Sequence, residues 1–156
     1  MITPTIEELW KRKSVRAYTD RKITKEEKEL ILRSASEAAS AGNQQMYTIL
    51  DITDQKLKDT LTVTCDNQPF IAKADLVLVF CVDFQKWYDT FRITGCDPRK
   101  PEAGDFLLAV LDTAIAAQNA VTAAESLGIG SCYIGDILER YEIHKELFHL
   151  PDYAAP

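Results

Sequence analysis

The hydrophobic pattern of the chain is densest between residues 103 and 135. From Phe106 to Leu127 the apolar residues cover nearly the whole circumference of one predicted helix, at Leu107, Leu108, Val110, Leu111, Ala114, Ile115, Ala117, Val121 and Ala124. A helix that is apolar all round is buried on most of its sides. Its polar residues interrupt the run too often for a membrane span: Asp112, Gln118, Asn119 and Glu125.

We expect Gly128 to end this helix at the position after its last turn. The next residues, Ile129–Gly135, alternate in the manner of a short strand that closes on a glycine. A core helix that leads into a glycine-flanked strand can offer main-chain N–H groups to a flat ligand.

The first part of the chain carries two sequence signals for the start of a helix. Thr5 to Glu8 and Thr24 to Glu27 both have the spacing of a capping box. We expect a first helix to about Lys11 and a second from Thr24 to about Ala41, ended by Gly42. Shorter helices are predicted over 55–64, 70–73 and 137–147, and residues 85–104 read as a helix and a surface loop.

Two strands are predicted from apolar runs. Met46–Ile52 follows the turn at Asn43-Gln-Gln45, and Asp75–Val82 is a continuous valine-rich run, the pattern of a strand covered on both faces. The chain ends at Pro156 in a segment that points toward a further strand which is not present in the sequence. We find no linker or repeat and expect one domain over 1–156.

The formal net charge of −6 is unevenly spread. Residues 1–33 hold nine basic and six acidic residues, a balance of +3, so the remainder carries −9. An acidic chain with one basic end is a poor nucleic-acid binder but can hold a small anion, such as a phosphate, at that end. A solvated charged surface is the alternative for each single charge.

Four cysteines without CxxC spacing, and no leader sequence, favour reduced thiols in the cytoplasm. Cys81 and Cys132 lie in apolar strand patterns, so we interpret them as core residues. The two histidines, His144 and His149, are spaced for different sides of a helix, and we expect no metal site.

Candidate chemistry lies in three polar stretches. Arg12, Lys13, Ser14 and Arg16 supply donors that suit a phosphate or an electron-rich ring edge. Asn43, Gln45 and Asn67 carry side chains that can bind a planar ligand or simply cap turns. We find no Rossmann glycine motif, P-loop or Ser-His-Asp arrangement, and therefore no catalytic side chain. If the protein is an enzyme, a bound cofactor carries the chemistry.

Five stretches resemble the FMN-dependent nitroreductase family, in the same order. They are Arg12-Lys-Ser-Val-Arg16 with Tyr18, Ala39-Ser-Ala-Gly-Asn-Gln-Gln45, Asn67-Gln-Pro-Phe70 with Asp75–Val82, Ala117-Gln-Asn-Ala-Val121 with Ala124-Glu-Ser-Leu-Gly128, and Ile129-Gly-Ser-Cys-Tyr-Ile-Gly135. The resemblance implies an α+β fold, with a mixed β-sheet flanked by helices on both sides. It also implies a homodimer with FMN at the interface and the long helix in the dimer core.

Site roles follow from the same resemblance. Arg12, Lys13 and Ser14 would bind the FMN phosphate and ribityl chain, and Arg16 would lie at the pyrimidine edge, where a cation raises the reduction potential. The other implied contacts come from Asn43, Gln45, Asn67 and the main-chain N–H groups of Ile134 and Gly135. Trp87, Tyr88 and Phe91 fall where relatives carry a variable substrate lid, although packing is an equal alternative.

The implied activity is hydride transfer from NADH or NADPH through FMN to nitroaromatics, quinones or similar small acceptors. Family members usually continue beyond the equivalent of Pro156 with a strand, further phosphate contacts and a tail that embraces the partner. The sequence therefore leaves a second hypothesis open: a binding or dimerisation module that holds flavin without turnover. A third hypothesis keeps the fold but changes the chemistry to dehalogenation or flavin fragmentation.

Overall fold

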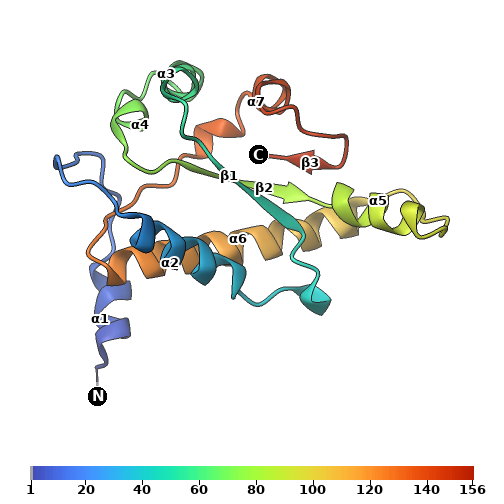
Figure 1. Ribbon diagram of the computed structural model, residues 1–156, viewed down its shortest axis with the longest axis horizontal. Coiled ribbons are helices and arrows are strands. Elements are labelled where there is room, and N and C mark those ends of the chain that lie inside the picture. The colour runs from blue at the N-terminus through green and yellow to red at the C-terminus, as the bar shows by residue number, and fades with distance from the viewer. Residues whose placement is uncertain (1) are drawn as a thin grey trace.

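Three antiparallel strands form the sheet in the computed structural model, which describes residues 2–156 (Figure 1). They are β1 (Tyr47–Asp51), β2 (Leu78–Asp83) and β3 (Ala154–Ala155), in the order β1-β2-β3. The register pairs Asp51 with Leu78, so the connection between β1 and β2 leaves and re-enters the sheet at the same end. Such a connection makes the two strands antiparallel. The expectation of a mixed sheet is therefore wrong for the described residues, whose one parallel pairing is an isolated bridge between Ser14 and Ser131.

Helices cover both faces of this sheet, as expected. Figure 1 shows α2 (Lys25–Ser36) and α6 (Ala103–Ser126) on one side and α3 (Gln55–Thr64), α4 (Phe70–Lys73) and α7 (Tyr141–Leu147) on the other. Side chains alternate along each strand. The first helical layer packs on Ile49, Leu78 and Phe80, and the second packs on Leu50, Val79 and Cys81. The prediction that the 75–82 run is covered on both faces is confirmed.

The long helix α6 lies close to its predicted bounds but is less buried than its composition suggests. Its small residues pack against α2 and the sheet, with Ala116 and Ala120 almost completely buried. Its larger residues face outward, and Leu107, Leu111 and Ile115 are 62%, 59% and 43% exposed. The prediction of burial on most sides is therefore wrong for the single chain, because α6 lies at the margin of the helical layer. By length and composition α6 could cross a membrane. It packs against α2 and carries two buried polar residues, Asp112 and Thr113.

Two boundary predictions in the first half of the chain differ from the structure. The helix α1 (Pro4–Lys11) begins with a proline after Thr3, so Thr5 lies inside the helix and makes no capping box. The box at Thr24 is confirmed, since Thr24 and Glu27 exchange side-chain and main-chain hydrogen bonds. Helix α2 ends at Ser36 rather than Ala41, and Gly42 lies in a 3-10 turn, η1 (Ala41–Asn43), with a φ of 57°.

The predicted strand at Ile129–Gly135 is wrong. Only the Ser14–Ser131 bridge pairs this segment, and a single pairing does not make a ladder. Gly135 instead begins a second 3-10 turn, η2 (Gly135–Ile137), and α7 starts at Tyr141 rather than Ile137. Cys132 is consequently half-buried rather than a core residue.

The remaining elements agree with their predictions. Helices α3 and α4 keep the bounds expected for them, and α5 (Gln85–Ile93) precedes the predicted surface loop. Cys81 is fully buried in β2, and this burial, followed by the nearby Asp83 carboxylate, raises the pKa of its thiol to about 12. That cysteine is a core residue, as its apolar surroundings predicted.

Candidate functional site

The basic segment 12–16 is joined to the chain that follows α6. Arg12 ends α1 with an extended backbone, and the N–H of Val15 donates to the carbonyl of Ser131 at 2.9 Å. The two strands of chain approach closely, because a Cβ atom built on Gly130 would lie 2.6 Å from Cγ2 of Val15. Only glycine at position 130 permits this approach, which fixes the basic segment beside Tyr133 and Ile134.

Replacing Gly130 by alanine is expected to lower the free energy of unfolding by ~1–3 kcal/mol, because the new methyl group forces Val15 away. Gly104→Ala is the matched control. It lies in α6 with no atom within 4 Å of the added Cβ, so its helix propensity should stabilise the chain by ~0.5–1 kcal/mol. Urea unfolding of both variants measures the difference, and equal effects would contradict the close-approach explanation.

The cations of this segment are free of carboxylate partners. Within residues 2–156, Arg12, Lys13 and Arg16 form no ion pair, whereas many other basic residues do. The guanidinium of Arg12 lies 5.9 Å from the ring centre of Tyr133, and that of Arg16 lies 5.8 Å from the ring centre of Phe70. Unpaired guanidinium groups held over aromatic rings can receive an anion without first breaking an ion pair.

Two tyrosines beside these cations remain neutral. Burial raises the pKa of Tyr133 against the opposing charge of Arg12. Burial also raises the pKa of Tyr18, helped by Cys132 and opposed by Arg16. The two phenols therefore add no negative charge beside the basic segment at neutral pH.

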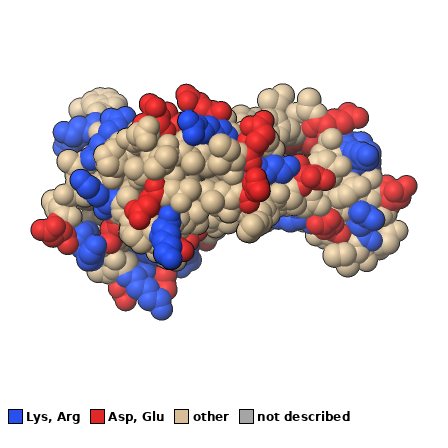
Figure 2. Space-filling model, turned by 90° about the horizontal axis from the view of Figure 1, so that it is seen from above, with Lys and Arg blue, Asp and Glu red and all other residues tan. Residues whose placement is uncertain are grey.

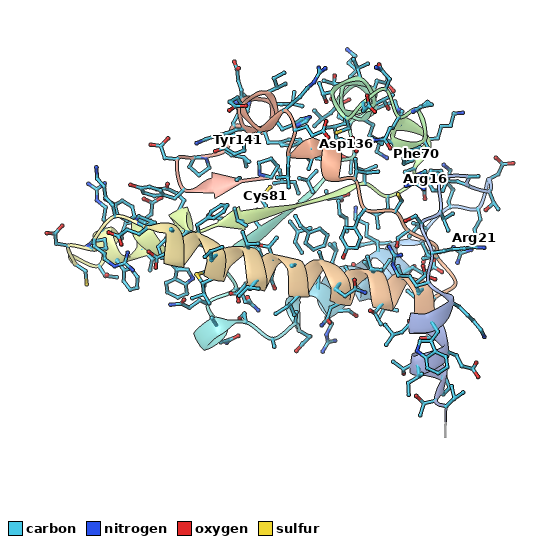
Figure 3. All side chains as sticks on the ribbon, turned by 180° about the vertical axis from the view of Figure 1, so that it is seen from behind. Arg16, Arg21, Phe70, Cys81, Asp136 and Tyr141 are labelled. Atoms are coloured by element: carbon cyan, nitrogen blue, oxygen red, sulfur yellow. The ribbon has the colours of Figure 1, made fainter. Side chains whose placement is uncertain are left out.

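The turn that carries Asn67 lies against the same region. Gln68 donates from Nε2 to the Asp136 carboxylate at 2.8 Å and to the Cys65 carbonyl at 3.0 Å. Figure 3 shows Arg16 and Phe70 close together near one end of the molecule, with Asp136 next to them on the side toward its middle. Three stretches that are far apart in the sequence, 12–16, 67–70 and 131–136, therefore meet.

Main-chain donors are available at this meeting point. Within residues 2–156, the N–H groups of Ile134 and Gly135 donate to no protein acceptor. Gly135 is exposed, and Ile134 precedes it at the start of η2. The two groups can hydrogen-bond a ligand that reaches the basic segment.

The turn with Asn43 and Gln45 lies elsewhere. Figure 1 places it below α6, well away from α1 and the basic segment, which lie at the opposite side of the view. The buried Asp112 carboxylate of α6 holds the turn by accepting from the N–H groups of Ala41 and Met46, at 3.0 and 3.3 Å. Gln45 uses its own Nε2 to donate to the Ser36 carbonyl at 2.9 Å. Within one chain, Asn43 and Gln45 are not brought to Arg12 and Arg16.

The aromatic residues of α5 accompany this second turn. The Trp87 indole N–H donates to the Gln44 carbonyl at 2.7 Å, and the Tyr88 ring meets the Tyr153 ring edge-on at 5.1 Å. Phe91 lies beside Trp87 and is 38% exposed. Trp87 and Tyr88 thus have packing roles, and of the three aromatic residues Phe91 is the one open to a ligand. Their role toward a substrate stays a prediction.

Several non-glycine residues in the two turns have a left-handed backbone. Asn43 and Gln45 have φ values of 56° and 49°, and Asp66 and Asn67 have 57° and 54°. Non-glycine residues rarely adopt this conformation, and they concentrate where surrounding structure holds a ligand site in place. Both turns with predicted cofactor contacts therefore carry this feature.

The sequence analysis assigned no role in the site to three groups near these turns: the Gln68–Asp136 pair, the buried Asp112 and the buried His144. Asp112 had a usable signal, because a carboxylate inside an apolar helix needs a partner. The other two pair across more than sixty residues of sequence, which no local pattern reveals. Within residues 2–156, no group of three His, Cys, Asp or Glu side chains could hold a metal ion.

Comparisons with known proteins agree on one family. A family model described as "Nitroreductase family" matches residues 9–156. An oxygen-insensitive NADPH nitroreductase of Salmonella typhimurium is 38% identical over 156 residues, which are 99% of this chain and 63% of that protein. An FMN reductase (NADPH) of Bacillus subtilis is 33% identical over 97% of this chain and 62% of its own length. The chain thus spans about three fifths of these curated relatives.

Solved structures give the same result for the fold. The NfrA1 nitroreductase from B. subtilis matches with a TM-score of 0.94 and 33% identity, over 97% of this chain and 62% of that one. The NADPH:FMN oxidoreductase from Vibrio harveyi, complexed with NAD+, matches with a TM-score of 0.89 and 32% identity, over 97% and 64% of the two chains.

Proposed function

This chain belongs to the nitroreductase family, and we propose that it works as an FMN-dependent oxidoreductase. In this proposal hydride passes from NADH or NADPH to nitroaromatic, quinone or similar small acceptors. The names of its relatives, an NADPH nitroreductase and an FMN reductase, support the reaction class. The expected location is the cytoplasm, where reduced nicotinamides are available.

The donor set at the basic end fits FMN. A phosphate needs cations and hydroxyl donors, and Arg12, Lys13 and Ser14 supply them. Among residues 2–156 no carboxylate pairs with either cation. Arg16 would place its charge near the ring, and Asn67 would contact the pyrimidine side. The free N–H groups of Ile134 and Gly135 would donate to the ring system. The bound FMN supplies the two-electron redox chemistry, and the chain's own groups bind and orient it.

A homodimer would complete this site. Members of the family are typically dimeric, and α6 presents an exposed apolar stripe over its first half, formed by Phe106, Leu107, Leu111 and Ile115. Large exposed apolar patches mark interfaces between proteins. We infer that two copies pack through this stripe about a two-fold axis.

The direction of α6 explains how a dimer joins the separated residues. The helix runs from the α5 end of the molecule to the α1 end (Figure 1). Two such helices packed antiparallel bring the α5 end of one chain to the α1 end of the other. Asn43, Gln45 and Phe91 of one protomer would then approach Arg12 and Arg16 of its partner.

The surface gives no competing partner on the face seen in Figure 2. Lys and Arg side chains are interspersed there with Asp and Glu and form no continuous basic field. A mixed surface of this kind offers a polyanion no extended track. The small-molecule function is therefore the one that the distribution of groups favours.

The free cations at the basic end are the observation that carries this proposal, and FMN titration is its test. Flavin fluorescence should be quenched on addition of the chain, and anaerobic NADPH or NADH should then bleach the yellow absorbance. Steady-state NADPH oxidation with a nitroaromatic acceptor should follow. Uptake of FMN without bleaching would indicate a non-catalytic flavin-binding module, and no uptake at all would overturn the cofactor assignment.

A further inference from the structure

His144 in α7 is completely buried and tied to two other segments. Its Nδ1 lies 2.7 Å from the carbonyl oxygen of Ile137, the last residue of η2. Its Nε2 lies 2.8 Å from Oγ1 of Thr64, at the end of α3, and 3.9 Å from Sγ of Cys65. One imidazole ring thus bridges the turn that begins at Gly135 and the helix that leads to Asn67.

The hydrogen bonds of His144 to Ile137 and to Thr64 differ in what their loss would leave unpaired. A carbonyl oxygen can only accept, so Nδ1 carries the proton and Nε2 accepts from the Thr64 hydroxyl. That hydroxyl has a second acceptor, the Thr60 carbonyl at 3.1 Å. The Ile137 carbonyl accepts from no other group within residues 2–156. Losing the Nδ1 bond would therefore leave a carbonyl unpaired, whereas losing the Nε2 bond would not orphan Thr64.

A second tie runs parallel to the first. The side-chain Nε2 of Gln68 donates to both the Cys65 carbonyl and the Asp136 carboxylate. This pair of hydrogen bonds is a second link between the end of α3 and η2. Asn67 lies beside one end of this tie, and Gly135 lies beside the other. Two of the predicted cofactor contacts, Asn67 and Gly135, are 68 residues apart in sequence and are held at a fixed spacing by these two bridges.

We propose that His144 and the Gln68–Asp136 pair form a clamp that positions the main-chain donors of Ile134 and Gly135, with His144 as the positioning residue. The clamp itself stands on the contacts above, and only its purpose toward FMN rests on the proposed function. A buried histidine with a purely structural role would stabilise the fold without any selective effect on FMN affinity.

Two conservative substitutions separate these roles. In His144→Asn the amide nitrogen takes the place of Nδ1 and can still donate to Ile137, while in His144→Gln the longer side chain reaches toward Thr64 instead. We expect similar losses of stability in urea unfolding for both. The dissociation constant for FMN should rise about tenfold in His144→Gln and less than about threefold in His144→Asn. Equal rises in the two variants would overturn the proposal.

Hydrogen exchange on the chain without FMN tests the clamp independently of the proposed function. Leu138 and Glu139 donate their N–H groups to the carbonyls of Gly135 and Asp136, so these two amides report on η2. Their exchange should be about tenfold faster in His144→Gln and close to wild type in His144→Asn. If neither variant folds, Asp136→Ala tests the same clamp from a half-buried position, with faster exchange expected at Leu138 and Glu139. Unchanged exchange overturns the clamp. If the variants show this exchange pattern but the wild-type chain takes up no FMN, the clamp stands and only the proposed function is overturned.

Discussion

Replacing Arg12 and Lys13 together by glutamine is expected to raise the dissociation constant for FMN by about 100-fold or more. Hydrogen bonds to charged groups contribute roughly 1.5–3 kcal/mol each, and two of them account for a change of that size. Since neither cation forms an ion pair within residues 2–156, the free energy of unfolding should change by less than ~1 kcal/mol. Fluorescence titration and urea unfolding measure the two quantities.

A matched control removes the same charge from another part of the N-terminal region. Lys25 and Arg33 lie exposed on α2 and pair with Glu29 and Glu37. Lys25→Gln with Arg33→Gln should leave FMN affinity within about twofold of wild type, because exposed ion pairs contribute little. If this control weakened binding as much as the test variant, general charge rather than the basic segment would be responsible.

Introducing aspartate at both Leu107 and Leu111 is expected to convert the proposed dimer into a monomer. Burial of each leucine in an interface is worth roughly 1.5–3 kcal/mol, and a carboxylate there must also be desolvated. The dimer dissociation constant should rise by at least about 10³-fold. FMN binding should fail with it, since Asn43 and Gln45 reach the basic segment only across the two-fold axis. Sedimentation velocity with and without FMN measures both effects.

Two other exposed apolar residues provide the control. Val63 on α3 and Leu30 on α2 are 57% and 52% exposed and lie outside the stripe on α6. Aspartate at both positions should leave the sedimentation coefficient and FMN uptake unchanged. A wild-type chain that sediments as a monomer and still binds FMN would contradict the shared site.

The elements that the sequence predicted well have local signals. The bounds of α3 follow from its apolar spacing and from Asp54, whose carboxylate accepts from the Lys56 N–H at its start. The capping box at Thr24 is likewise a matter of four consecutive residues. The strand predicted at Ile129–Gly135 failed because strand formation depends on a partner, and Ser14 is the one residue that pairs there. The burial of α6 was overestimated because composition does not reveal which neighbours a helix has.

The candidate site was predictable in its residue types but not in its arrangement. The resemblance named Arg12, Arg16, Asn67 and Gly135, and the fold brings their segments together. Nothing in the sequence showed that Asn43 would lie at the other side of the molecule, because that depends on the path of α2 alongside α6. The role of His144 could not be predicted from the sequence either, since its partners are a carbonyl and a hydroxyl on other elements.

The left-handed residues of the two turns set a limit on engineering this chain. Each non-glycine residue in that conformation costs roughly 1 kcal/mol relative to glycine, and Gln45 and Asn67 both adopt it. Glycine at position 67 would relax the backbone and raise the melting temperature, but it would delete the amide that the ligand is expected to contact. At position 45 glycine would also remove the hydrogen bond that Gln45 Nε2 donates to the Ser36 carbonyl, which offsets the relaxation. The natural residue at position 67 thus favours ligand recognition over thermal stability. A design procedure that optimises melting temperature alone would select glycine there and lose a predicted cofactor contact.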